Sequence, residues 1–176
     1  MNFDVARIYA IKLLVEGLVT YNKESTMDKV VIPADQLGPK VVEDLFNSIP
    51  PTKQGIAIGI ANETSHEWSG TNAFFFSGKP GRITIPEFVG IDQAALFTAT
   101  KRTGRASGSA GVITFFIPDD DMTVAVMFSV PFSHLVYENW WNAKVYRNKK
   151  EADKDMWSQM YYQEPFKGDN GWHEKE

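Results

Sequence analysis

Aromatic residues gather between positions 137 and 162 of this sequence, with polar residues between them. The group consists of Tyr137, Trp140, Trp141, Tyr146, Trp157, Tyr161 and Tyr162. Tyrosine and tryptophan combine an apolar ring with a polar edge, which suits a membrane–water boundary, and their ring faces can hold a quaternary ammonium by cation–π attraction. The cluster is therefore a candidate site for a lipid headgroup. The alternative is that some of these rings, such as Trp140 and Trp141, fill the core of a β-sandwich.

Residue patterns typical of enzymes and metal sites are scarce. His66, His134 and His173 lie in separate turn-like stretches without a carboxylate or a second histidine at ligand spacing. Residues 119–121 are three aspartates that lack the alternating ligands and glycine of an EF-hand loop, so a hairpin turn is the better interpretation. Residues 104–108 are rich in glycine but contain no P-loop lysine. We therefore predict a protein that is not an enzyme and uses no cofactor.

The overall composition is that of one ordinary globular domain. The chain has 176 residues, of which 43% are hydrophobic and 23% charged, enough for a domain with a sizeable core. A formal net charge of -4 gives no general attraction to nucleic acid or anionic lipid, which are bound largely through clustered Lys and Arg. The sequence has no cysteine, which excludes a disulfide framework and a thiolate metal site. No run approaches the roughly 18 to 20 apolar residues of a transmembrane helix.

The elements that position the aromatic cluster follow from the pattern after Pro51. Short β-rich runs alternate with stretches rich in turn residues, which is typical of a sandwich or barrel. The predicted strands are Gly55–Ala61, Trp68–Phe76, Arg82–Ile85, Ala94–Thr100, Ala110–Ile117, Thr123–Val130 and Trp141–Tyr146. A late helix is predicted over Glu151–Tyr162, where Trp157 and Tyr161 project together because they are four residues apart.

Two helical patterns precede the β-rich region. From Phe3 to Val19 polar residues recur at multiples of four, which predicts an amphipathic helix that docks on the domain, on a partner or on a membrane. The second helix should begin near Pro39 and stop before Pro50, because proline suits a first turn and disrupts a helix interior. Its apolar residues are Leu37, Val41, Val42, Leu45, Phe46 and Ile49. Such a helix can lie on the domain or in a headgroup layer, and the pattern alone does not choose.

Several ordered blocks of the sequence carry a more specific likeness. They are Ile56–Ile60, Asn72–Gly78, Ile85–Phe88, Phe128–Phe132, Tyr137–Trp141, Tyr161–Tyr162 and Lys167–Lys175. In this order they resemble the conserved blocks of the actinoporins, the pore-forming cytolysins of sea anemones and their relatives. The resemblance covers roughly residues 30 to 175.

The resemblance implies a mainly β fold, an actinoporin-like β-sandwich flanked by two α-helices. Residues 1–29 would then be an N-terminal helical extension and linker, which has no counterpart in typical mature toxins. Residues 30–176 would be the actinoporin-like domain, with the amphipathic helix segment in residues 30–50 and the β-sandwich with its late helix in residues 51–176. Because family members continue past the position that matches Glu176, we expect a C-terminally short domain that lacks the last strands of the family.

The resemblance also implies a phosphocholine-binding site. Matching motifs assign this site to Ser77, Ala110, Ser129, Pro131, Tyr137, Trp157, Tyr161 and Tyr162. Trp157 stands where relatives carry tyrosine, and Ala110 stands where relatives carry valine. Trp157 can still face a choline, but it presents an indole N–H in place of a phenol.

Further residues are implied in membrane attachment and assembly. Leu135, Val136 and Trp140 match the membrane-facing surface, which has fewer aromatic rings here than in lytic members. The amphipathic helix is implied to detach from the sandwich and insert through Leu37, Val41, Val42, Leu45, Phe46 and Ile49. The triplet Lys167, Gly168 and Asp169 resembles an Arg-Gly-Asp triplet linked to oligomer contacts, although lysine lacks the bidentate geometry of arginine.

We therefore predict a pore-forming cytolysin-like protein that binds phosphocholine headgroups such as that of sphingomyelin and inserts an amphipathic helix to permeabilise membranes. The alternative is a non-lytic lectin-like or headgroup-binding module on the same sandwich. The predicted partners are membrane lipid with a sphingomyelin or phosphatidylcholine headgroup and, on membranes, further copies of this chain, with no nucleic acid. We expect a secreted soluble form that associates with target membranes, although no signal peptide is recognised. In a secreted protein the formal sequon Asn62-Glu63-Thr64 would be a candidate glycosylation site.

Overall fold

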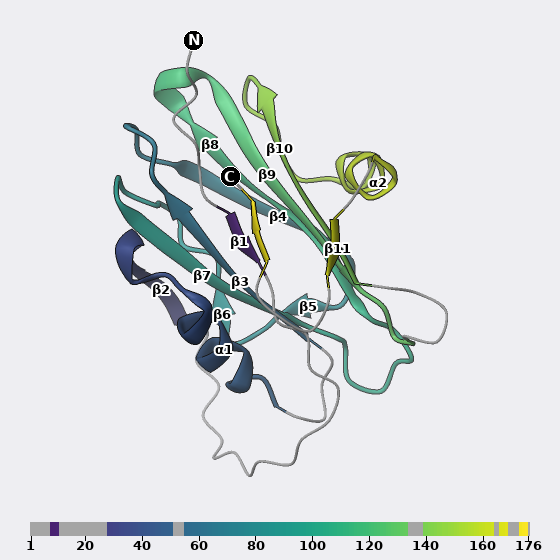
Figure 1. The fold of residues 1–176 in the computed structure, drawn as a ribbon. Coiled ribbons are helices and arrows are strands. Elements are labelled where there is room, and N and C mark those ends of the chain that lie inside the picture. The colour runs from purple at the N-terminus through teal and green to yellow at the C-terminus, as the bar shows by residue number, and fades with distance from the viewer. Residues whose placement is uncertain are drawn as a thin grey trace.

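The computed structural model describes residues 8–10, 28–50, 55–133, 139–163, 166–168 and 173–175. Two β-sheets pack face to face, and each carries one helix on its outer face (Figure 1). The predicted mainly β fold, a sandwich flanked by two helices, is confirmed.

The first sheet has seven strands in the order β12-β1-β3-β7-β2-β6, with β5 also paired to β7. Among its described strands every pair is antiparallel except β2 with β6. The strands are β1 (Ile8–Ala10), β2 (Asp28–Pro33), β3 (Gly55–Asn62), β5 (Lys79–Pro80), β6 (Ile83–Thr84), β7 (Gln93–Thr100) and β12 (His173–Lys175).

The second sheet has five antiparallel strands in the order β11-β10-β9-β8-β4. They are β4 (Ser69–Ser77), β8 (Ser109–Ile117), β9 (Met122–Val130), β10 (Asn139–Arg147) and β11 (Phe166–Gly168). The turn between β8 and β9 is the short 3-10 helix η2 (Pro118–Asp120), and Asp121 after it has a left-handed backbone with φ 48°. The interpretation of the three aspartates as a hairpin turn is therefore confirmed.

The sandwich core lies between the two sheets. Every second residue of β3, namely Ile56, Ile58 and Ile60, points into this core, as the two-residue period of a strand requires. Rings from the other strands complete it: Trp68, Phe97, Phe115, Phe128 and Trp141. Trp141 is 2% exposed, so for this residue the core interpretation holds. Its neighbour Trp140 lies on the other face of β10 and does not belong to the interior cluster.

Helix α1 (Pro39–Asn47) follows the 3-10 turn η1 (Ala34–Gln36) and packs on the outer face of the seven-stranded sheet. As predicted, Pro39 occupies the first turn and the helix ends before Pro50. Its apolar face is turned to the sheet: Leu37, Val42, Leu45, Phe46 and Ile49 are buried, and Val41 is half-buried.

The part of the sheet surface below α1 that β3 contributes is made of small residues. Gly55, Ala57, Gly59 and Ala61 are the outward positions of β3, and Ala57 and Ala61 pack with the helix. A Cβ on Gly59 would overlap the Cδ1 atom of Leu37, and a Cβ on Gly55 would lie 3.1 Å from the Cδ1 atom of Ile49. The two apolar residues that flank α1 in the sequence therefore fill two glycine recesses in one strand.

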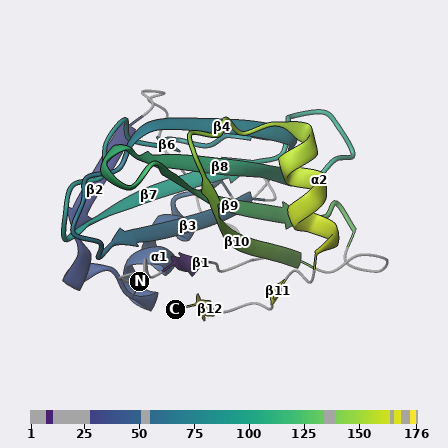
Figure 2. The ribbon, with the colours of Figure 1, turned by 90° about the horizontal axis from the view of Figure 1, so that it is seen from above.

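Helix α2 (Lys154–Tyr162) covers the outer face of the five-stranded sheet, where Figure 2 shows it lying across the strands. Asp153 caps its first turn by accepting a hydrogen bond from the backbone N–H of Met156 at 2.7 Å. For this reason the helix begins at Lys154 and not at Glu151. Met156, Trp157 and Met160 form its buried face.

Two expectations about the start of the chain are wrong. Ile8–Ala10, inside the helix predicted over Phe3–Val19, form β1, because the backbone of β3 offers hydrogen-bond partners that an edge strand would otherwise leave open. Residues 30–33, assigned to the amphipathic helix segment, belong to β2. Val30, Val31 and Ile32 are β-branched and pair with β7. The remainder of the Phe3–Val19 prediction lies outside the described residues.

The seven predicted strands are all present, with bounds within two residues of those expected. Five strands were not predicted: β1, β2, β5, β11 and β12. These are mostly two or three residues long, too short for an alternating pattern to be recognised. Neither helix in the described part of the chain is long and apolar enough to cross a membrane.

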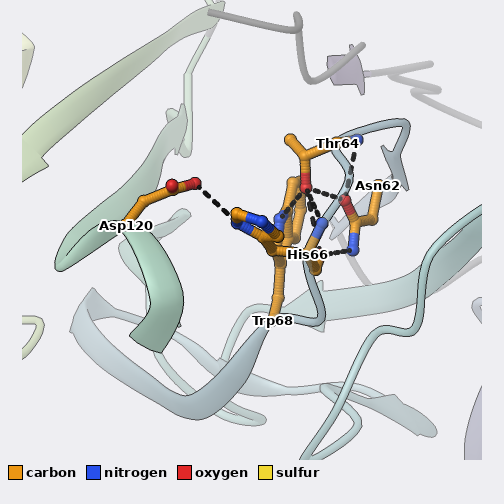
Figure 3. A network of polar contacts seen from close by, with 5 residues as sticks. All are labelled: Asn62, Thr64, His66, Trp68 and Asp120. Carbon is orange, nitrogen blue, oxygen red and sulfur yellow. Dashed lines mark hydrogen bonds and ion pairs between the residues drawn. The ribbon is translucent and has the colours of Figure 1, made fainter.

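Asn62 organises the turn that follows β3 (Figure 3). Its Nδ2 atom donates to the carbonyl oxygens of His66, Val89 and Gly90 at 2.8, 3.0 and 3.1 Å. Its Oδ1 atom accepts from the backbone N–H and the hydroxyl of Thr64 at 3.0 and 2.6 Å. Because Asn62 is 0% exposed and its amide is fully used, the folded protein cannot carry a glycan there.

The same turn is connected to Trp68 and to η2 (Figure 3). The indole N–H of Trp68 donates to Thr64 Oγ1 at 3.1 Å. His66 Nδ1 lies 3.1 Å from Asp120 Oδ2 but is not aligned for a hydrogen bond, so this contact is an ion pair only when His66 is protonated. The polar network therefore has a structural role at the end of β4 where Ser69 lies.

We expect Asn62→Ala to lower the free energy of unfolding by roughly 2 to 4 kcal/mol, because five hydrogen bonds are lost at a buried position. Urea denaturation followed by circular dichroism measures this. Thr64→Ser, which keeps the hydroxyl, is the control and should change stability little. Equal stability of the two variants would contradict the role given to Asn62.

Candidate headgroup site

Four of the predicted site residues lie in one row across the five-stranded sheet. Ser77 pairs with Ala110, Ala110 with Ser129, and Ser129 with Trp140. On the next strand Lys167, from the predicted oligomer triplet, pairs with Trp140. Directly opposed residues of antiparallel strands present their side chains on the same face. The register thus brings together residues that are distant in sequence.

The row faces α2 and not the sandwich core. Ala110 is buried in a cluster with Met127, Met156, Trp157 and Met160, which joins the sheet to the helix. The aromatic residues of α2 therefore lie next to the two serines of the row. Hydroxyls on the sheet and aromatic rings on the helix therefore lie on the same side of the five-stranded sheet.

A β-bulge shapes the β4 end of the row. Phe75 pairs with Gly111 and Ser77 with Ala110, so Phe76 is an extra residue between them. Phe75 packs against the sandwich core, whereas Phe76 stacks on Trp157. Ser77 Oγ donates to the carbonyl of Gly108 at 3.0 Å. To donate to a phosphate oxygen, the Ser77 hydroxyl would have to give up this bond.

Trp157 lies between two rings. Phe76 stacks on it with centroids 4.1 Å apart and planes 9° apart, and Tyr161 stacks on it at 4.9 Å and 21°. Its indole N–H donates to the carbonyl of Phe128 at 3.3 Å, and the residue is 6% exposed. In this structure Trp157 supports its neighbours. The predicted contact of its ring face with a choline would require one of the two stacks to open.

The accessible rings of the site are Tyr161 and Tyr162, with Trp140 beside them. Tyr162 is 79% exposed and meets Tyr161 edge to face at 5.0 Å. Trp140, on the sheet, lies 6.3 Å from Tyr161 between ring centroids. Pro131, directly after β9, is half-buried. These rings can offer faces and edges to a quaternary ammonium.

Part of the predicted site lies outside the described residues. The residues concerned are Tyr137 of the headgroup set, Leu135 and Val136 of the membrane-facing surface, and Asp169 of the oligomer triplet. Their roles stay predictions. Gly168 lies in β11 and pairs with Asn139.

Near Tyr161, in the C-terminal half of α2, polar side chains attach the helix to β10. The hydroxyl of Tyr146 donates to Gln159 Oε1 at 3.2 Å, and the ammonium of Lys144 lies 5.0 Å from the centre of the Tyr146 ring. Burial raises the pKa of Tyr146, and the charge of Asp153 adds to the effect. The phenol therefore stays protonated and remains a donor at neutral pH. In the described part of the chain no cluster of His, Asp or Glu could hold a metal ion.

Comparison with known proteins decides the family. A family model described as sea anemone cytotoxic protein matches residues 26–176. The chain is an actinoporin. Members of this family are pore-forming cytolysins and not enzymes, so the non-enzymatic prediction is confirmed at the level of the family.

Several curated actinoporins are similar over most of their length. DELTA-stichotoxin-Hcr4b of Radianthus crispa is 38% identical over 140 residues, 79% of this chain and 78% of that protein. DELTA-actitoxin-Oor1b of Oulactis orientalis is 40% identical over 144 residues, 81% of this chain and 82% of its own. Nigrelysin of Anthopleura nigrescens is 40% identical over 147 residues, 82% of this chain and 68% of its own.

The solved structure of a lipid-binding protein, Nakanori, gives a weaker match, with a TM-score of 0.49 and 22% identity over 57% of this chain and 48% of that one. This likeness carries no argument about function.

Sequence reasoning missed Phe76 in this actinoporin. It occupies the unspecified position directly before Ser77 in the motif, so nothing in the pattern marked it. The only available signal was an aromatic triplet, Phe74 to Phe76, in a strand that should alternate. A bulge places this third ring on the α2 side.

We expect Gly108→Ala to disturb the whole row, because a Cβ there would overlap the backbone oxygen of Val130 and lie 2.9 Å from the carbonyl carbon of Pro131. The backbone cannot rotate away as a side chain can. The loss in free energy of unfolding should reach or exceed about 3 kcal/mol. Urea denaturation measures it, with Gly38→Ala as control because no atom lies within 4 Å of a Cβ there. Similar small losses in both variants would contradict the close approach.

Proposed function

We propose that this actinoporin attaches to bilayers through phosphocholine headgroups, those of sphingomyelin above all, and then releases α1 into the membrane to form an oligomeric pore. The observation that supports it best is the row Ser77–Ala110–Ser129–Trp140 beside the half-buried Tyr161 and the exposed Tyr162. We infer that the protein, like other members of its family, is secreted in a soluble form and then associates with target membranes.

The chemistry of the row fits a zwitterionic headgroup. The Ser129 hydroxyl can donate to a phosphate oxygen, and the Ser77 hydroxyl can do so once it releases the carbonyl of Gly108. The faces of Tyr161 and Tyr162 can hold the quaternary ammonium next to it. A zwitterion also suits a chain whose formal net charge is -4, because it is not repelled by that charge.

The hydrophobic contribution to the free energy of moving α1 from the sheet into the membrane is close to zero. Leu37, Val42, Leu45, Phe46 and Ile49 are buried against the sheet, and in the membrane they would be buried against lipid. The free energy that favours insertion must therefore come from attachment of the protein to the bilayer, which raises the effective concentration of the helix there.

Insertion across the bilayer requires more than α1. Its 9 residues span about 14 Å at 1.5 Å per residue, about half of the roughly 30 Å hydrocarbon core. A spanning helix would have to recruit the residues before Pro39, including β2 (Asp28–Pro33), which would leave the sheet. We propose that β2 and α1 leave together. Contacts between subunits would then involve Lys167, Gly168 and Asp169.

A non-lytic headgroup-binding module is the second candidate. One observation favours it: Leu37 and Ile49 fill glycine recesses on β3, which keeps α1 docked. In that case the site binds a choline headgroup or a glycan without a later insertion step.

The headgroup proposal predicts that Tyr161→Ala with Tyr162→Ala weakens binding about fivefold to thirtyfold, because two ring contacts of about 0.5 to 1 kcal/mol each are removed. Sedimentation with sphingomyelin vesicles and titration with free phosphocholine measure this. The control is Ile91→Ala, which removes a side chain that is 52% exposed on a loop near the Asn62 network. If the double variant binds as the control does, these tyrosines are not the headgroup site.

The insertion proposal can be tested with a disulfide, since the chain has no cysteine of its own. In Leu37→Cys with Gly59→Cys, the sulfur at 37 would replace Cγ, which lies 3.4 Å from a Cβ on residue 59, near disulfide geometry. The oxidised variant should bind sphingomyelin vesicles without releasing trapped dye, and the reduced variant should release it. Equal dye release in both states would remove α1 detachment from the mechanism. Binding without release even by the wild type would favour the non-lytic module.

A further inference from the structure

Phe76 is unusual because it is a large apolar ring that remains half in solvent. It is 50% exposed although one face is stacked on Trp157 with planes only 9° apart. It lies on β4, an edge strand of the five-stranded sheet. The bulge that places it there also places Ser77, so the ring lies at the border of the headgroup row.

Three cations surround the turn that follows this ring. The Arg102 guanidinium donates through Nε to the carbonyl of Gly78 at 3.1 Å. Lys79 pairs with Thr100, the residue before Lys101. Lys79 and Arg102 are exposed, and Lys101 is half-buried with its ammonium 5.5 Å from the centre of the Phe132 ring. The loop is thus held against the end of β4.

The chain segments that carry these cations contain no acidic residue to offset their charge. Residues 69–86 and 93–118 contain neither Asp nor Glu, although the whole chain has a formal net charge of -4. Among the described residues, no carboxylate is within ion-pair distance of Lys79, Lys101 or Arg102. The local charge is therefore positive where the overall charge is negative.

This environment does not suit a choline. A quaternary ammonium at Phe76 would approach the turn that carries Lys79 and is bonded by Arg102 at Gly78, and like charges repel. An apolar ring with cations next to it instead matches the membrane interface, where a ring enters the apolar boundary and Lys or Arg meet phosphate. Acidic phospholipids supply the negative charge that such cations attract.

We propose that Phe76, with Lys79, Lys101 and Arg102, is a second membrane-contact site that binds acidic phospholipid and needs no choline headgroup. It goes beyond the proposed headgroup function and does not depend on it. Because Phe76 and Ser77 are consecutive residues of one bulge, both sites meet the same bilayer surface. The formal net charge of the whole chain gives no general attraction to anionic lipid. The positive charge next to Phe76 would attract such lipid locally.

The test uses the full chain and vesicles of phosphatidylglycerol and phosphatidylethanolamine, which contain no choline. At low ionic strength the wild type should sediment with them, and binding should weaken as salt is added. Phe76→Ala should bind about tenfold less well, since half-exposed aromatic area no longer enters the interface. The matched control is Phe88→Ala, whose ring is 58% exposed beside Val89, which pairs with Trp68 at the other end of β4.

Phe76→Ala also removes the stack on Trp157 and could weaken binding through a folding defect, so a second variant tests the charges alone. Lys79→Gln with Lys101→Gln changes side chains that do not touch Trp157 and should weaken binding about fivefold for each charge. The proposal is overturned if the wild type does not bind choline-free acidic vesicles. It is also overturned if either variant binds them as Phe88→Ala does. Failure to bind free phosphocholine, with acidic vesicles still bound, would overturn the headgroup proposal and leave this one standing.

Discussion

The close approach of β8 to its two neighbours is the constraint on which the candidate site depends. Gly108 leaves no room for a side chain against the backbone of Val130, and Gly111 leaves none against the carbonyl of Phe74. With the strands held at these points, Ser77, Ala110, Ser129 and Trp140 come into one row. Trp157 fixes the helix above that row, because its indole N–H bonds to a β9 carbonyl while its ring is held between Phe76 and Tyr161.

The two helices are attached to their sheets in different ways. The buried face of α2 consists of large residues and is reinforced by polar bonds, among them two from Asn142 Nδ2 to the carbonyls of Met160 and Gln163 at 3.0 Å each. The docking surface of α1 combines Gly and Ala of β3 with larger apolar residues such as Leu96 of β7, and apolar contacts of its side chains hold it there. Apolar contacts can be replaced by lipid, whereas buried hydrogen bonds cannot. This difference fits a fixed helix that carries a binding site and a second helix that can leave.

The two membrane contacts proposed for this protein suit different kinds of lipid headgroup. Hydroxyls and tyrosine rings suit a zwitterionic headgroup, and a phenyl ring with adjacent cations suits an acidic interface. Both lie at the same end of the five-stranded sheet, because β4 ends at Ser77 where β8 and the loop before it begin. The Asn62 network lies at the opposite end of β4 and stabilises turns without facing the candidate site.

The sequence pattern by itself determined the mainly β class, seven of the strands and both helices. The residues of the candidate site came from the resemblance to the actinoporins, and their roles stay predictions. The alternation of residue types along strands such as β3 and the prolines around α1 are local signals. Such signals can be recognised in the sequence without knowledge of the fold. The sequence did not determine β1, because a short segment takes its structure from the open edge beside it and not from its own pattern. The tertiary structure alone decided that Trp141 is core while Trp140 faces α2, that Asn62 is buried, that both faces of Trp157 are covered, and that Phe76 is exposed. Each of these depends on strand register or on a bulge, and a shift of one residue reverses which face a side chain occupies.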